Sequence, residues 1–191
     1  MKKKESRYLF KEKRLQLLPF EIEKLDDLLL IQFQKLIIDI PSLIMTYSPV
    51  KKLSEFDPKL ITDYCYFKNP EQQLFYPLMV EHRGINEMIA VIVDDNTLFE
   101  TNKYGIDEPI DGLDMLTNEI DLILVPLLCF DKKGYRVGYG KGYYDRFLSS
   151  CRSDCLKIGF SYFEPVDIIE DVDKFDIKLN YCITPRSIFT F

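Results

Sequence analysis

The chain has 191 residues, of which 47% are hydrophobic, and it carries a formal net charge of −6. This length and apolar share predict one globular domain, residues 1–191, with a substantial buried core. The negative charge excludes nucleic acid as the main partner, because binding a duplex requires a large basic face.

The basic start of the chain, residues 1–4, is not followed by the apolar stretch that a signal peptide contains. The other apolar runs are interrupted within a few residues, whereas a transmembrane helix needs about 20 apolar residues in succession. We therefore expect a cytoplasmic protein that has no membrane partner and is a monomer.

The chain contains one histidine, His82, and five cysteines. A single histidine excludes a metal site built from several histidines of one chain. We expect His82 in the loop between two strands, without a ligand role. An odd number of cysteines without a C-x-x-C motif indicates reduced thiols in a cytosolic protein.

Hydrophobic periodicity in the first third of the chain predicts two helices, followed by a strand and a third helix. The corresponding segments are residues 3–18, 19–36, 43–47 and 55–65.

The pattern in the middle of the chain predicts two strands, residues 73–79 and 88–93. It also predicts a third, short strand near the edge of the sheet, residues 98–100. The apolar run at residues 122–125 is typical of a strand buried on both faces of a parallel sheet. It is followed by a glycine-rich loop, a helix and two strands: residues 134–142, 143–151, 157–162 and 181–184.

This alternation of strands and helices predicts an α/β fold, a three-layer α/β/α sandwich with a mainly parallel central sheet. Ligands of such folds bind beyond the carboxyl ends of the central strands.

The glycine-rich loop is the strongest candidate for a functional site. Gly138, Gly140 and Gly142 alternate, and glycines at such spacing let backbone N–H groups approach a polyphosphate. Arg136 and Lys141 add two cations to the loop. The pattern is not a Walker loop, which needs Ser or Thr after the lysine, and it is not a dinucleotide fingerprint. A simple turn between a strand and a helix stays open as an alternative.

A longer pattern around this loop resembles the 5-formyltetrahydrofolate cyclo-ligases, also called methenyltetrahydrofolate synthetases. It comprises DLILVP at residues 121–126, then Phe130, Asp131, Gly134 and Arg136, and GYGKGYYDRFL at residues 138–148. Weaker landmarks of the family extend the resemblance over most of the chain: Lys3, Arg7, Tyr47, residues 55–57, residues 105–109, Asp176 and Thr184.

The resemblance implies a reaction that uses ATP, with Mg²⁺, to convert 5-formyltetrahydrofolate into 5,10-methenyltetrahydrofolate, releasing ADP and phosphate. ATP would phosphorylate the formyl oxygen on N5, and N10 would then attack the activated carbon. Such phosphoryl transfer needs positioning and surrounding cations more than it needs a protein nucleophile. The partners implied are therefore a formylated reduced folate and ATP.

The resemblance also implies roles for individual residues of this chain. The catalytic residues would be Lys141, Arg136 and Tyr144. ATP would be bound by Lys3, Arg7, Arg136, Val137, Gly138, Tyr139, Gly140, Lys141, Gly142, Tyr143 and Tyr144. The folate would be bound by Glu55, Tyr139, Gly140, Lys141, Gly142 and Tyr143. The metal ligands would be Asp145 and Asn180.

The sequence departs from the family pattern at three positions. Ser6 replaces the usual leucine, Phe175 replaces a frequent histidine, and Asn180 stands where the family has a second magnesium aspartate. An asparagine can still bind Mg²⁺ through its amide oxygen, but it supplies no negative charge.

Each candidate also has a purely structural interpretation. Glu55 could cap a helix, Lys3 and Arg7 could form a solvated helix face, and Tyr143 and Tyr144 could be core aromatics. Two alternatives to a 5-formyltetrahydrofolate cyclo-ligase stay open as well. One is a relative that binds nucleotide or folate with weak or no catalysis, and the other is an ATP-using enzyme that acts on another formamide or amide.

Overall fold

The fold is built on a mixed sheet of eight strands in the described part of the chain, residues 1–82 and 84–191 of a computed structural model. Its strand order is β12 (Ile188–Thr190), β11 (Tyr181–Ile183), β10 (Leu156–Phe160), β7 (Leu122–Val125), β1 (Leu43–Met45), β2 (Gln73–His82), β3 (Ile85–Val93) and β6 (Asp114–Met115).

The five strands from β11 to β2 run parallel to one another. Antiparallel pairing is confined to the outer strands, where β12 pairs with β11, β3 with β2, and β6 with β3. The predicted mainly parallel sheet is therefore confirmed.

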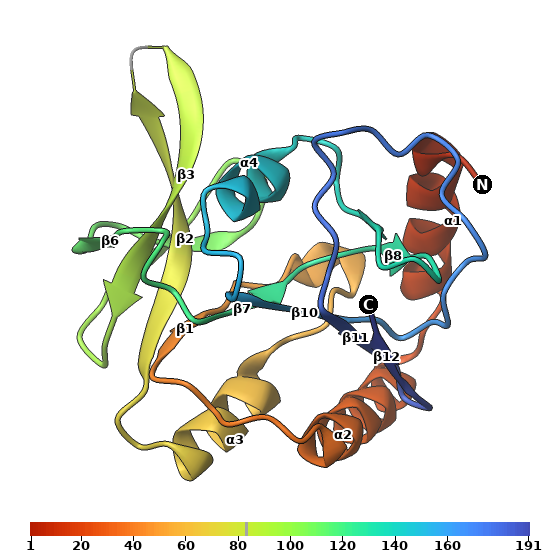
Figure 1. The fold of residues 1–191 in the computed structure, drawn as a ribbon, viewed down its shortest axis with the longest axis horizontal. Helices are drawn as coiled ribbons and strands as arrows, with labels where there is room; N and C mark the ends of the chain where they lie inside the picture. Colours follow the sequence, from red (N-terminus) through yellow and green to blue (C-terminus); the bar gives the residue numbers. More distant parts are fainter. Residues whose placement is uncertain (83) are drawn as a thin grey trace.

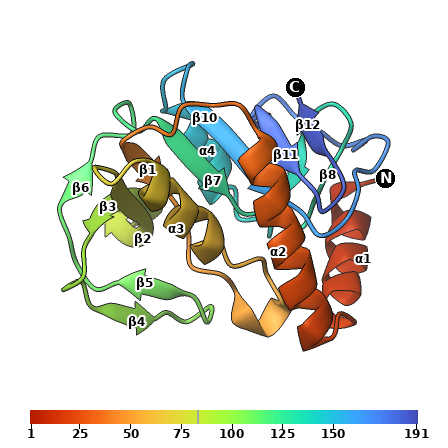
Figure 2. The same cartoon turned by 90° about the horizontal axis from the view of Figure 1, so that it is seen from below.

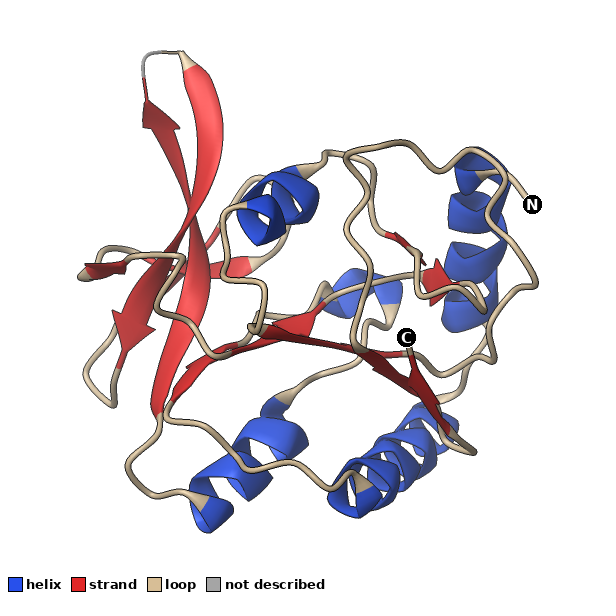
Figure 3. Ribbon diagram, in the orientation of Figure 1, coloured by secondary structure: helices blue, strands red, loops and turns tan. Residues whose placement is uncertain are grey.

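Helices cover both faces of this sheet (Figures 1 and 3). Helices α2 (Pro19–Lys35) and α3 (Lys59–Lys68) lie on one face, and α4 (Tyr143–Ser149) lies on the other. Figure 2 shows α2 and α3 in front of the strands, with α4 behind them. Helix α1 (Lys3–Leu15) packs beside the small ribbon of β8 (Cys129–Phe130) and β9 (Arg136–Val137). The three layers agree with the prediction.

Strand β7 shows how the sequence specifies these layers. All four of its residues are buried, and successive side chains point to opposite faces. Leu122 and Leu124 join the core beneath α2 and α3, whereas Ile123 and Val125 join the core beneath α4. A continuous apolar run is therefore required at this strand, as in other parallel sheets covered on both sides.

The predicted helices form, but their bounds differ by a few residues: α1, α2 and α4 end earlier than predicted, whereas α3 ends later, at Lys68. The second begins with Pro19 at its first turn, and the Glu21 carboxylate accepts a hydrogen bond of 2.8 Å from the Leu18 amide. Helix α3 begins at Lys59, after Pro58, instead of at residue 55. Among the described residues, no helix is long and apolar enough to cross a membrane.

The strands of the middle region differ more from the prediction. Strands β2 and β3 form one continuous antiparallel hairpin that projects beyond the sheet (Figure 1). His82 is consequently the last residue of β2 instead of a loop residue, and Arg83 lies outside the described residues.

The short strand near residues 98–100 is not at the edge of the central sheet. It is β4 (Phe99–Thr101), and it pairs with β5 (Asp107–Pro109) in a separate two-stranded sheet. Five short strands, β5, β6, β8, β9 and β12, are not predicted from the sequence, because their pairing partners and not their own sequence stabilise them.

Gly159 offers a test of packing in the sheet, because the side chains of neighbouring segments fill the space beside it. A Cβ atom there would lie 2.5 Å from Leu127 Cδ2 and 2.8 Å from Leu179 Cδ1. We expect Gly159→Ala to lower the free energy of unfolding by about 1–3 kcal/mol, measured by urea denaturation. Gly138→Ala is the matched control, with open space around the added methyl group, and should change stability by less than about 0.5 kcal/mol. Equal stabilities would contradict this packing.

Candidate active site

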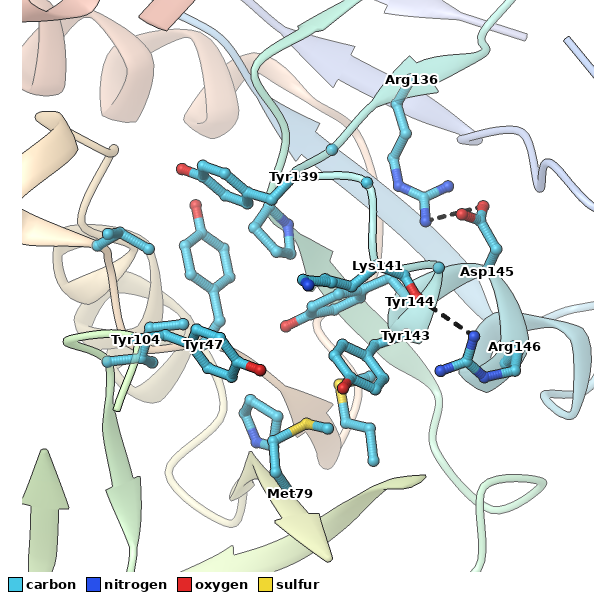
Figure 4. Close-up of a pocket in the computed structure, with 18 of the residues that line it drawn as sticks. Tyr47, Met79, Tyr104, Arg136, Tyr139, Lys141, Tyr143, Tyr144, Asp145 and Arg146 are labelled. Atoms are coloured by element: carbon cyan, nitrogen blue, oxygen red, sulfur yellow. Dashed lines mark hydrogen bonds and ion pairs between the residues drawn. The ribbon is translucent and has the colours of Figure 1, made fainter. Parts of the chain in front are cut away.

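A cavity of about 840 Å³ opens beyond the carboxyl ends of strands β1 and β7 and beside the hairpin (Figure 4). Tyr47 follows β1, Pro126 follows β7, and Met79 comes from the distal half of β2. The opposite wall consists of the glycine-rich loop and the start of α4. The cavity therefore lies where the fold class places ligand sites.

The glycine-rich loop forms this wall because Gly140 and Gly142 adopt left-handed backbone conformations. The φ angle is 93° at Gly140 and 69° at Gly142, the residue immediately before α4. A Cβ atom at Gly140 would lie 3.0 Å from Cζ of Arg7. The positive φ favours glycine at this position, and an added Cβ atom would also crowd the Arg7 side chain.

Two cations of α1 lie at the edge of the cavity. Arg7 Nε donates a hydrogen bond of 3.0 Å to the carbonyl oxygen of Gly138, which joins α1 to the loop. Lys3 Nζ lies 2.7 Å from Asp176 Oδ1 and is largely buried. Neither residue is part of a merely solvated helix face.

Lys141 is a cation of the loop that faces the cavity. Its ammonium group points toward the middle of the cavity, above Tyr144 in Figure 4. Within the described residues, no carboxylate oxygen lies within 4.0 Å of Lys141 Nζ. An anionic ligand can therefore pair with this lysine without first displacing a protein carboxylate.

Arg136, in contrast, is engaged within the protein. Only 7% of the residue is exposed, its NH2 group lies 3.2 Å from Asp145 Oδ1, and its NH1 group donates to the carbonyl oxygen of Ile177 at 2.8 Å. The Ile177 amide in turn donates to Asp145 Oδ1 at 3.3 Å. Burial lowers the pKa of Arg136, and Asp145 acts in the opposite direction. Arg136 thus fixes the orientation of Asp145.

Glu55 lies on the wall facing the loop, and its carboxylate is almost completely buried. Its Oε1 accepts a hydrogen bond of 2.7 Å from the hydroxyl of Tyr139, and its Oε2 accepts one of 2.9 Å from the Val50 amide. Arg14 NH1 lies 3.7 Å from Oε1. Burial raises the pKa of Glu55, and the positive charge of Arg14 opposes this effect.

A short turn places Glu55 in the cavity. The 3₁₀ helix η1 (Lys51–Leu53) ends at Ser54, which has a left-handed conformation with φ 48°. The chain thereby folds back so that the Glu55 side chain bonds to the amide at position 50. Glu55 does not cap α3, which begins four residues later. The interpretation of Glu55 as a cap of this helix is therefore wrong, and its binding role stays a prediction.

Tyr143 and Tyr144 occupy different environments at the start of α4. The Tyr143 ring lies beneath the guanidinium of Arg146, 5.0 Å from ring centroid to Cζ. The Tyr144 ring packs against the core under α4, and its hydroxyl is buried without a hydrogen-bond partner among the described residues. An unpaired buried hydroxyl at a cavity wall is a group that a bound ligand can satisfy.

The structure brings together most of the predicted site residues. Those that line the cavity are Lys3, Arg7, Glu55, Arg136, Gly138, Tyr139, Gly140, Lys141, Gly142, Tyr143, Tyr144 and Asp145.

Val137 and Asn180 are not among the described residues that line this cavity. The side chain of Val137 is buried in the core between α1 and the loop. Asn180 lies between β10 and β11, where its Oδ1 accepts a hydrogen bond of 2.9 Å from the Lys157 amide. The amide of Asn180 donates back to the Lys157 carbonyl oxygen at 2.9 Å. This pair of bonds joins the start of β11 to β10, and within the described residues no hydrogen bond links Asn180 to Asp145.

Other lining residues were not predicted from the sequence. They include Tyr47, Met79, Tyr104, Ile106 and Glu108. Glu108 is a further partly buried carboxylate at the cavity wall, and burial raises its pKa. Residues 105–109 match a landmark of the family, which is a sequence signal for this segment. The match does not indicate that the side chain of Glu108 faces the cavity.

The two tyrosine hydroxyls at this cavity provide a matched stability test. Tyr139→Phe removes the bond to the buried Glu55 carboxylate, so we expect it to lower the free energy of unfolding by about 1–3 kcal/mol. Tyr144→Phe removes a hydroxyl without a partner and should leave stability unchanged or slightly raised. Urea denaturation of the unliganded proteins measures both. A large loss in Tyr144→Phe with none in Tyr139→Phe would contradict the hydrogen bonds described.

Comparison with known proteins gives a consistent result. A model of the 5-formyltetrahydrofolate cyclo-ligase family matches residues 60–185. The chain is 35% identical over 130 residues to the 5-formyltetrahydrofolate cyclo-ligase of Mycoplasma pneumoniae, covering 65% of this chain and 72% of that protein.

Two solved structures resemble the whole fold. The 5,10-methenyltetrahydrofolate synthetase of Aquifex aeolicus has a TM-score of 0.79 at 28% identity, with 100% of this chain and 93% of that chain covered. The synthetase of M. pneumoniae has a TM-score of 0.72 at 25% identity, with 96% and 98% covered. The resemblance seen in the glycine-rich loop thus extends to the complete fold, and the chain belongs to the 5-formyltetrahydrofolate cyclo-ligase family.

Proposed function

We propose that this chain converts 5-formyltetrahydrofolate into 5,10-methenyltetrahydrofolate, using Mg²⁺ and ATP and releasing ADP and phosphate. The observation that carries the proposal is that one cavity holds both the Lys141 ammonium group and the buried Glu55 carboxylate. A lysine without a protein counter-ion suits a phosphate, and a carboxylate suits the N–H donors of a pterin ring. We still expect a cytoplasmic monomer.

The reaction balances without a covalent bond to the protein. The formyl oxygen attacks the γ-phosphorus of ATP, and the bond to ADP breaks. N10 then attacks the formyl carbon and loses its proton, and the former formyl oxygen leaves with the phosphate as the ring closes. The site has to hold the reactants in line and to neutralise the transferred phosphoryl group.

The nucleotide side of the cavity would be the loop and α1. Lys141 would contact the transferred phosphoryl group, and the backbone around Gly140 would approach the phosphates without steric hindrance. Arg7 already bonds to the loop and would add a second positive charge beside it. Tyr143 lies at the junction with the folate side.

The folate side would be the opposite wall. Glu55 would accept hydrogen bonds from ring N–H groups, and the side chains of Tyr47, Met79, Tyr104 and Ile106 would pack against the flat ring system. These groups are apolar or aromatic around one buried acceptor, the composition expected of a small-molecule site. The unpaired hydroxyl of Tyr144 would find its hydrogen-bond partner on a bound reactant.

Asp145 is the residue that would hold Mg²⁺. Among the described residues there is no group of three metal-binding side chains. Mg²⁺ bound with nucleotides commonly has one or two carboxylate ligands, with phosphate oxygens and waters completing the shell, so a single carboxylate fits. When bound, the ion would neutralise charge on the phosphates. Arg136 keeps the Asp145 carboxylate oriented beside the loop.

Turnover can be followed by the near-ultraviolet absorbance of the methenyl product in mildly acidic buffer with Mg²⁺, ATP and 5-formyltetrahydrofolate. We expect Lys141→Ala to reduce kcat at least about tenfold, equivalent to about 1.4 kcal/mol of transition-state stabilisation. Lys133→Ala removes an exposed lysine of the same segment and should retain wild-type turnover. Wild-type protein that binds both ligands without product would favour a binding relative. Full activity in folded Lys141→Ala would contradict the proposed site.

A magnesium titration separates the two candidate ligands. Asp145→Asn should raise the Mg²⁺ concentration needed for half-maximal turnover, because the ion loses its charged protein oxygen. Asn180→Asp should give the wild-type titration curve, since this side chain bonds to the Lys157 amide between β10 and β11. A lower half-saturating concentration in Asn180→Asp would show instead that position 180 reaches the metal.

A further inference from the structure

Arg14 is an arginine that the proposed reaction leaves without a role. It lies in the last turn of α1, only 2% of it is exposed, and it is not among the described residues that line the cavity. Arginine is rarely buried to this extent without paired partners. The other cations of the helix that face the site, Lys3 and Arg7, both line the cavity.

The guanidinium of Arg14 reaches behind the cavity wall to three acceptors. NH1 donates to the hydroxyl of Tyr139 at 3.2 Å and lies 3.7 Å from Glu55 Oε1. NH2 donates to the carbonyl oxygen of Leu127. The Tyr139 hydroxyl, which accepts from Arg14, donates to Glu55 Oε1 at 2.7 Å. Arg14 therefore acts on Glu55 both directly and through Tyr139.

Among the described titratable groups that face Glu55, Arg14 is the one that carries a positive charge. These groups are Arg14 from α1, Tyr139 from the loop, Tyr47 after β1 and Tyr144 from α4. The three tyrosines are neutral near pH 7 and can only donate hydrogen bonds or exclude water. Burial alone favours the protonated carboxyl group, so the positive charge on the protein side of the carboxylate decides which form predominates.

The ionisation state of Glu55 affects ligand binding, because only the ionised carboxylate accepts hydrogen bonds on both of its oxygens. The Tyr139 hydroxyl and the Val50 amide each occupy one lone pair of the carboxylate. Its remaining lone pairs are available to donors in the cavity. A protonated carboxyl group would place a donor where a ring N–H also donates, and the ligand would be rejected.

We infer that Arg14 is a positioning residue of the folate site, which keeps Glu55 ionised and its carboxylate oriented through Tyr139. This inference rests on the proposed function for the identity of the ligand, but the effect of Arg14 on Glu55 exists without a ligand. Arg14 itself touches no reactant.

The test compares Arg14→Met with Lys13→Met, which removes one positive charge from an exposed position of the same helix. The titration of Glu55 is followed by carbon-13 NMR of the glutamate carboxyl groups, with Glu55→Gln identifying the signal. We expect the pKa of Glu55 to rise by about one pH unit or more in Arg14→Met and to stay unchanged in Lys13→Met. Arg14→Lys keeps the charge and should retain most of the wild-type titration.

Turnover gives the second readout. The acid limb of kcat/KM for formylfolate should move to higher pH in Arg14→Met, in step with the carboxyl titration, while kcat at saturating folate above the limb is retained. The KM for ATP should not change. In Glu55→Gln this limb should be absent, because the titrating group is gone.

The outcomes are separable. The role of Arg14 is overturned if the Arg14→Met protein folds and both its Glu55 titration and its acid limb of kcat/KM match those of the wild type. If Arg14→Met does not fold, Arg14→Gln supplies the neutral variant that keeps a side-chain donor, and the same comparison decides. Wild-type protein that does not convert formylfolate overturns the proposed function, and the NMR titration still decides whether Arg14 controls Glu55.

Discussion

The contact between α1 and the glycine-rich loop is the constraint on which the site depends. The hydrogen bond from Arg7 to the Gly138 carbonyl oxygen joins segments separated by 131 positions in the chain. At Gly140 the two segments approach so closely that a Cβ atom would lie 3.0 Å from the Arg7 guanidinium. One face of α1 thereby completes the cavity that the sheet alone would leave open. Loss of this contact would remove two cations and the support of Glu55 together.

Buried charge is distributed on both sides of this contact. On one side, Arg14 and Tyr139 hold Glu55, and on the other, Arg136 holds Asp145. Burying charged groups is costly unless each is paired and hydrogen-bonded. Both arginines meet that condition, because each also donates to a backbone carbonyl oxygen. Lys141, which also lines the cavity, has no carboxylate oxygen within 4.0 Å of its ammonium group among the described residues, which leaves its charge for a ligand.

Much of this arrangement could be predicted from local sequence. The apolar run of β7 and the alternating glycines act through backbone geometry that is encoded within a few residues. The roles of single polar side chains were harder to predict. Arg136 lies in the expected loop, yet it is engaged with Asp145 and Ile177, because the pairing of a buried guanidinium depends on segments distant in sequence.

Dependence on distant segments also explains the positions of Asn180, Val137 and Arg14. Asn180 aligns with a metal ligand of the family, but the register between β10 and β11 directs its amide to Lys157. Val137 lies inside the binding motif, and strand alternation turns it into the core. Arg14 is one of several basic residues in the sequence of α1, and nothing local indicates that it faces a carboxylate 41 positions later.

The cavity is proposed to direct phosphoryl transfer to the formyl oxygen of a reduced folate. The most direct measurement uses 5-formyltetrahydrofolate labelled with oxygen-18 in the formyl group, with Mg²⁺, unlabelled ATP and the wild-type chain. Mass spectrometry of the phosphate released then reports where the formyl oxygen goes. We expect each released phosphate to contain one labelled oxygen, and the labelled phosphate to appear at the same rate as the methenyl product. Methenyl product accompanied by unlabelled phosphate, or ATP hydrolysis that does not depend on the folate, would contradict this proposal.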